Sequence, residues 1–74
     1  MFLEVRHLRS LQAIEETGNL HSAAERLHLT QSALSHQIKR IEAYFEVPLF
    51  LRSSKPLRLT PAGRRLVELA GRVL

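Results

Sequence analysis

The 74-residue sequence contains no cysteine, no tryptophan and no aspartate. Without cysteine the chain has neither a disulfide nor a thiolate-ligated metal. Without aspartate it has no Ser-His-Asp arrangement, and the only adjacent carboxylates, Glu15 and Glu16, would not face each other on a helix. We therefore expect no catalytic activity, no metal site and no cofactor.

Long apolar runs are also missing. No run approaches the roughly 18 residues that a membrane-spanning helix needs. The N-terminus lacks the charged and then apolar pattern of a signal peptide. We expect a cytoplasmic protein of one small domain, whose core is built from leucine, isoleucine, valine and alanine because only three phenylalanines and one tyrosine are present.

The charge that is present is basic and uneven. The net charge is +4 and the isoelectric point is about 10.7. Residues 47–67 contain five basic residues and no acid, whereas four of the seven acids lie in the first 25 residues. Such a concentration favours a polyanionic partner, although a merely solvated surface stays open on charge alone.

Three helices are predicted in the first two thirds of the chain. Apolar residues at three-residue steps, Val5 to Ile14, predict a helix over about 4–16 with that stripe in the core. Gly18 suits a left-handed helix end, and Asn19 suits the cap of a short helix over 20–27. Paired alanines in that helix would allow close packing against a neighbour.

The third helix, residues 30–46, carries the most informative pattern. Thr30 is a suitable cap. One narrow arc is apolar and should be buried: Leu34, Ile38, Ile41 and Phe45. Another flank consists of hydrogen-bond donors without an acid: Gln31, Ser32, Ser35, His36 and Lys39. With only His28 and Leu29 between the second and third helices, this arrangement is typical of a helix-turn-helix that places its second helix in the major groove of DNA.

A short hairpin and a fourth helix should follow. Pro48 prevents further helix, a short extended run begins at Phe50 and Leu51, and residues 57–59 alternate like a second strand after a turn. This hairpin, the wing over 49–59, must pack on the helices through Leu49, Leu57 and Leu59. Thr60-Pro61 is typical of a helix start. The helix after it has an apolar face wider than one internal contact requires: Leu66, Leu69, Ala70, Val73 and Leu74. We expect this face to pair with a second chain, and the helix to continue in a longer parent protein.

The chain resembles the N-terminal domain of LysR-type bacterial transcriptional regulators. The resemblance covers nearly the whole sequence and rests on residues 23–27, 30–38, Glu42, 49–52 and 59–63. It implies a mainly α fold, a winged helix-turn-helix over 1–60 and the start of a linker and dimerisation helix over 61–74, with the effector-binding domain absent. It also implies a homodimer on an interrupted palindrome of double-stranded DNA and a higher oligomer in the full-length protein.

Residue roles follow from this resemblance by position. It places four residues against bases: Gln31, Ser32, Ser35 and His36. It places others against the DNA backbone or on the wing: His21, Ser22, Thr30, Lys39, Arg52, Lys55 and Arg58. Independently, a glutamine amide suits an adenine edge, and lysine and arginine suit phosphates.

Two positions depart from the family pattern. His36 stands where many members have arginine, so a two-point guanine contact is not expected there. Glu46 stands where glycine usually ends the third helix; if its backbone is left-handed, glutamate costs roughly 1–2 kcal/mol that glycine would not. The alternative function is a winged helix that binds protein, which would be expected to expose an apolar or acidic flank on the third helix.

Overall fold

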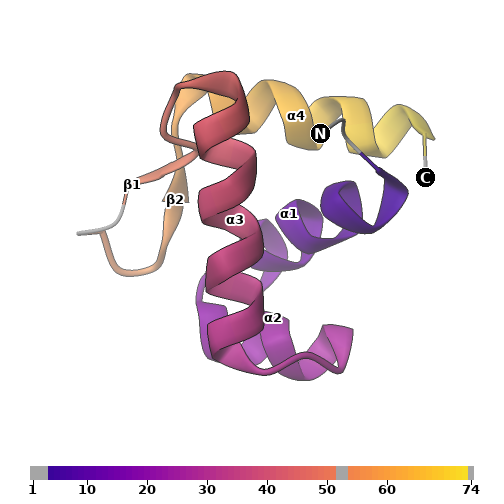
Figure 1. Cartoon of the computed structure of the whole chain (residues 1–74), viewed down its shortest axis with the longest axis vertical. Helices are drawn as coiled ribbons and strands as arrows, with labels where there is room; N and C mark the ends of the chain where they lie inside the picture. The colour runs from indigo at the N-terminus through magenta and orange to yellow at the C-terminus, as the bar shows by residue number, and fades with distance from the viewer. Residues whose placement is uncertain (1–3, 52–53, 74) are drawn as a thin grey trace.

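The computed structural model describes residues 4–51 and 54–73. Over these residues the chain forms, in order, α1 (Val5–Thr17), α2 (Leu20–Leu27), α3 (Gln31–Phe45), β1 (Phe50–Leu51), β2 (Arg58–Leu59) and α4 (Pro61–Val73). Figure 1 shows α3 crossing in front of α1, with α2 at its N-terminal end and the hairpin and α4 near its C-terminal end. The predicted mainly α, winged helix-turn-helix fold is confirmed.

The corner between α1 and α2 follows the predicted signals. Gly18 has a φ of 77° and its N–H donates to the Ile14 carbonyl at 2.8 Å, which ends α1. The Asn19 side-chain oxygen then accepts from the Ser22 N–H at 2.7 Å and caps α2. Gly18 and Asn19 therefore end α1 and start α2 within two residues.

The turn between α2 and α3 has a feature that the sequence did not suggest. His28 is left-handed, with φ 59° and ψ 40°, a conformation in which glycine or asparagine is more usual. The Leu29 N–H donates back to the Ala24 carbonyl at 2.9 Å, and Thr30 caps α3 through the Ala33 N–H at 3.0 Å. The predicted short turn and cap are confirmed.

The core gathers around α1, which packs against α2, α3 and α4. Its buried members lie in α1, α2, α3 and the start of the hairpin: Leu11, Ala13, Ile14, Ala23, Ala24, Leu34, Ile38, Ile41, Leu49 and Phe50. Leu66 and Val67 of α4 pack against this cluster. Two core predictions are wrong. Val5 is 47% exposed and Phe45 is 40% exposed, because each lies in an end turn of its helix. Phe45 instead meets Tyr44 edge-to-face, with ring centres 5.0 Å apart.

The hairpin pairs Phe50 with Leu59 and Leu51 with Arg58 in antiparallel register. Leu49 is fully buried, and Leu57 and Leu59 pack against the core, as predicted. A side chain on Gly63 would collide with the Leu49 carbonyl, so α4 approaches the hairpin closely only because glycine stands there.

Thr60 joins the hairpin to α4. Its side-chain oxygen accepts from the Gly63 N–H at 3.1 Å and donates to the Pro48 carbonyl at 2.7 Å. The predicted start of the fourth helix at Thr60-Pro61 is confirmed.

The face of α4 is less exposed than the sequence suggested. Ala70 is fully buried within its own domain, and Leu66 packs partly against the core. Ala70 therefore has no exposed surface to offer a second chain, contrary to its expected place in a dimer contact. Leu69 is 40% exposed. The side chain of Val73 and residue Leu74 lie outside the part of the chain that the structure describes.

Candidate nucleic-acid interface

The polar flank of α3 is presented to solvent. Gln31, Ser32, His36 and Lys39 are exposed and Ser35 is half-buried. On the opposite side of the helix, Leu34, Ile38 and Ile41 anchor α3 in the core, which fixes the direction of the flank. Among residues 4–51 and 54–73, no hydrogen bond or ion pair engages the five polar side chains of the flank. Their donors are therefore available to a ligand.

The N-terminal end of this flank adjoins α2. Thr30 is exposed, and its side-chain oxygen accepts the cap hydrogen bond, so its hydroxyl proton remains available to an acceptor. His21 and half-buried Ser22 lie in the first turn of α2. Glu25 approaches His21 at 3.6 Å between Oε1 and Nε2. A phosphate that binds His21 would therefore compete with the Glu25 carboxylate.

Two basic residues of the wing are exposed. Lys55 lies in the turn and Arg58 lies in β2. Arg52, which the resemblance also assigned to the wing, lies outside the described residues. The Leu57 N–H donates to the Gly18 carbonyl at 2.8 Å, so the wing is tied to the α1–α2 corner.

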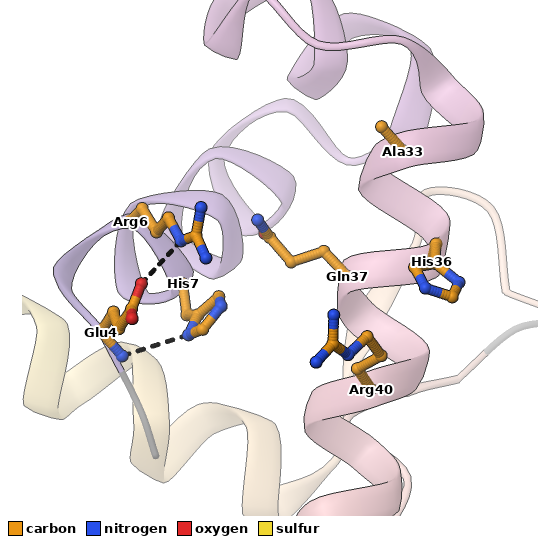
Figure 2. A pocket seen from close by; sticks show the side chains of 7 residues that line it. All are labelled: Glu4, Arg6, His7, Ala33, His36, Gln37 and Arg40. Carbon is orange, nitrogen blue, oxygen red and sulfur yellow. Dashed lines mark hydrogen bonds and ion pairs between the residues drawn. The ribbon is translucent and has the colours of Figure 1, made fainter. Parts of the chain in front are cut away.

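A hollow of about 460 Å³ lies between α3 and the first turn of α1, and His36 of the polar flank is among the residues that line it. Figure 2 shows Gln37 and Arg40 of α3 across from the first turn of α1, where Arg6 Nε contacts Glu4 Oε1 at 2.7 Å. The Gln37 side-chain oxygen is buried and has no hydrogen-bond partner among the described residues. Arg40 also lines the hollow and adds a basic group to this edge of α3. The sequence pattern does not single it out.

His7 forms the buried wall of this hollow and is only 7% exposed. Its Nδ1 accepts from the Glu4 backbone N–H at 3.1 Å, which requires an unprotonated Nδ1. Burial lowers the pKa of His7, and the charges of Arg6 and Arg40 lower it further against a smaller opposing effect of Glu4. The folded state therefore favours the neutral form of the His7 imidazole.

Other kinds of site receive no support from the described residues. Within 4–51 and 54–73, no three histidine, cysteine or acidic side chains are grouped so that they could hold a metal ion. In the same residues, no helix is both long and apolar enough to cross a membrane.

The chain is similar to known regulators along most of its length. Residues 5–64 match the family described as bacterial regulatory helix-turn-helix protein, lysR family. The HTH-type transcriptional regulator MetR of Haemophilus influenzae is 60% identical over 73 residues, which are 99% of this chain and 24% of that protein. MetR of Escherichia coli K12 is 51% identical over 72 residues, 97% of this chain and 23% of that protein.

These relatives agree with a finer resemblance in the sequence. Residues 27–37 and 55–61 resemble the methionine-biosynthesis regulators among LysR-type proteins. The small neutral protease regulatory protein of Streptomyces coelicolor is also similar, with 51% identity over 67 residues, 90% of this chain and 20% of that protein. The chain spans about a quarter of the length of the MetR relatives.

Two solved complexes have closely similar folds. The crystal structure titled BenM_DBD/catB site 1 DNA complex has a TM-score of 0.89 and 34% identity, over 96% of this chain and 80% of that one. The structure titled CbnR_DBD-DNA complex has a TM-score of 0.86 and 38% identity, over 96% of this chain and 82% of that one. Both are complexes with DNA.

Proposed function

Because the chain belongs to the lysR family of bacterial regulatory helix-turn-helix proteins, we propose that it binds double-stranded DNA in a sequence-specific manner as part of a transcriptional regulator. In this proposal α3 enters the major groove and the wing lies near the adjacent minor groove. The observation that carries the proposal is the exposed, donor-rich and acid-free flank of α3. The similarity to two DNA complexes that are covered over four fifths of their length supports it.

The residues on the flank divide by chemistry. Gln31, Ser32, Ser35 and His36 are proposed to contact base edges, where a glutamine amide can form a two-point contact worth about 1–3 kcal/mol of discrimination. Thr30 and Lys39 are proposed to hold phosphates, as are His21 and Ser22 at the N-terminus of α2. Phosphate contacts position the protein and make its affinity depend on salt, but they do not choose the sequence.

The wing is proposed to extend the contact beyond the major groove. Lys55 and Arg58 are exposed, and Arg52 is included from the family pattern. Basic side chains at a minor groove respond to its width and to its negative potential. The contribution of these side chains to the binding free energy should therefore depend on the shape of the minor groove in the flanking sequence, more than on the identity of its bases.

We also propose that residues 1–60 form the DNA-binding unit and that residues 61–74 begin a linker helix that forms a homodimer. Exposed Leu69 supports a contact on α4, whereas buried Ala70 does not take part. A two-fold dimer would place its two α3 helices one or more DNA turns apart, which matches an interrupted palindrome. The full-length protein is further proposed to form a higher oligomer. Its proposed location is the cytoplasm.

A protein-binding winged helix is the alternative function. It predicts an apolar or acidic exposed flank on α3, and the flank has neither character. Salt-sensitive binding to DNA would separate the two functions. The polar side chains of the α3 flank, the α2 N-terminus and the wing do not form a recognisable catalytic arrangement among the described residues.

Site selection from random duplexes tests the proposal. The chain should enrich one family of sequences with two-fold related half-sites. The logarithm of its binding constant for the selected duplex should fall linearly with the logarithm of the salt concentration, with a slope set by the number of phosphates contacted. A chain that enriches no sequence, or that binds every duplex equally, contradicts sequence-specific recognition.

A further inference from the structure

The hollow of about 460 Å³ between α1 and α3 combines cationic side chains with a largely buried hydrogen-bond donor. Figure 2 shows Gln37 and Arg40 extending from α3 toward α1, with the ring of His7 facing them. We propose that this hollow binds a small molecule through a terminal oxyanion group, a carboxylate or a phosphate monoester. The inference goes beyond the proposed function, because a site for a small anion does not depend on DNA binding by α3.

His7 supplies the donor at the back of the hollow. Its Nδ1 accepts from the Glu4 backbone N–H at 3.1 Å, so the hydrogen of the neutral imidazole lies on Nε2. His7 is only 7% exposed, and no hydrogen bond engages its Nε2 among residues 4–51 and 54–73. A donor in a largely buried side chain needs an acceptor, and this one can find it only in the hollow. An anionic oxygen of a ligand would be that acceptor.

Two guanidinium groups lie at the rim of the hollow. Arg40 is exposed and forms no hydrogen bond or ion pair within the described part of the chain. Arg6 Nε contacts Glu4 Oε1 at 2.7 Å, but a guanidinium has several N–H donors, so one carboxylate leaves some of them for a ligand. Glu4 is the one acid among the described residues that line the hollow. The two arginines outweigh its charge, and a guanidinium can bind a carboxylate or a phosphate through paired hydrogen bonds.

The Gln37 amide completes the wall on the side of α3. Its oxygen is buried and has no hydrogen-bond partner among the described residues. Because no donor holds that oxygen in place, the amide can turn and offer its NH₂ group to a ligand. Donors from both helices therefore surround the space: two guanidinium groups, one imidazole and one amide.

A terminal group fits this hollow better than a phosphate within a DNA strand. Each phosphate of a strand is attached to two sugars, which hold it away from the largely buried donor of His7. A carboxylate or a phosphate monoester has one attachment, so its oxygens can enter the hollow. The volume also lies within the range of about 300–1,000 Å³ that is usual for small-molecule sites. A small organic acid or phosphate ester is therefore the favoured class of ligand.

Titration of the 74-residue chain with small anions tests the site. Acetate and methyl phosphate present terminal oxygens. Dimethyl phosphate has the same charge as acetate, but it carries two ester groups, as a DNA phosphate does. NMR spectra of the imidazole nitrogens, recorded at constant ionic strength in chloride, measure binding at His7. Acetate and methyl phosphate should shift the His7 Nε2 resonance until it saturates, and dimethyl phosphate should bind at least about fivefold more weakly than acetate.

Arg40→Gln should weaken the binding of acetate and of methyl phosphate by about tenfold, because it removes a charge-assisted hydrogen bond at an exposed position. Gln37→Leu removes the amide and should weaken both anions by about threefold. Arg65→Gln is the matched control, since Arg65 is exposed on α4 and is not among the residues that line the hollow. It should bind both anions within about twofold of the wild type.

Two results would overturn the site: a His7 resonance that responds to acetate and methyl phosphate no more than to chloride, and Arg40→Gln binding as tightly as the Arg65→Gln control. Dimethyl phosphate that binds as tightly as acetate would also overturn it, and would make the hollow a contact for the DNA backbone instead. None of these titrations measures the binding of a duplex, so failure of the anion site leaves the proposed function standing.

Discussion

Glu42 of α3 holds the start of the wing through Leu49. Its Oε2 accepts from the Leu49 backbone N–H at 2.7 Å, and the Leu49 carbonyl accepts from the Thr60 N–H at 2.9 Å. Leu49 is fully buried. One residue therefore links the recognition helix, the hairpin and the start of α4, so the wing cannot move freely relative to α3.

Glu42→Ala should lower the free energy of unfolding by about 1–3 kcal/mol, because it leaves the buried Leu49 N–H without its acceptor. Glu42→Gln keeps a side-chain oxygen at that position and should cost less. Urea unfolding followed by circular dichroism measures both. Glu15→Ala, at an exposed position of α1, is the control and should stay within about 0.5 kcal/mol of the wild type. Equal stability of Glu42→Ala and the control would show that this bond does not hold the wing.

Glu46→Gly should stabilise the domain by about 1 kcal/mol, because Glu46 ends α3 with a φ of 58°. Glu46→Ala tests the reason, since it removes the charge but keeps the Cβ that makes this conformation costly. It should gain little or nothing. Thermal unfolding of the two variants decides the matter, and a melting temperature that falls for Glu46→Gly would rule out backbone strain at this corner.

Stability should decrease as the pH falls below about 6.5, the ordinary pKa of histidine. The folded state lowers the pKa of His7, so between the folded and unfolded values the unfolded chain binds more protons. The contribution is therefore fully present above the unfolded value and is lost as the pH falls towards the folded value. Urea unfolding at pH 7.5 and 5.5 measures this loss.

His7→Gln separates His7 from the other histidines. Glutamine at this position can still accept the Glu4 N–H but does not titrate. The variant should lose most of the pH dependence, whereas His36→Gln, at an exposed position, should retain it. The same dependence in both variants would assign the effect to another group.

Leu69→Glu should abolish a concentration-dependent dimer in sedimentation and leave the monomer folded, because Leu69 is 40% exposed on α4. Ala70→Glu is its contrast. Ala70 is fully buried, so glutamate there should lower the free energy of unfolding by several kcal/mol, and the variant should unfold instead of forming a folded monomer. If wild-type chain stays monomeric at all concentrations and binds a palindrome no better than one half-site, α4 does not form the dimer contact.

The local signals of this fold could be predicted because each has a short-range physical cause. Gly18, Asn19, Thr30 and Thr60 end or cap helices through bonds to residues three or four positions away. The left-handed His28 could not be predicted in the same way, since a histidine in the sequence does not by itself require that conformation. Its turn is imposed by the packing of α2 against α3.

Positions at the helix ends were the least predictable. A periodic pattern cannot tell where the core stops, so it places Val5 and Phe45 in the core although both are exposed. It also cannot tell which chain covers an apolar face, so it offers Ala70 to a partner although Ala70 is buried within its own domain. A hollow of about 470 Å³ is lined by residues from three separate segments, among them Asn19, Gln31 and Lys55, and no sequence spacing indicates it.

The most direct test of DNA reading by α3 compares Gln31→Ala with Lys39→Ala on a library of duplexes. Both residues are exposed on the same flank, but an amide reads a base edge and an ammonium holds a phosphate. Gln31→Ala should flatten the preference at one position per half-site, and Lys39→Ala should weaken all sequences about equally and reduce the salt slope by about one. Loss of affinity in both variants without any change in sequence preference would contradict base reading by Gln31.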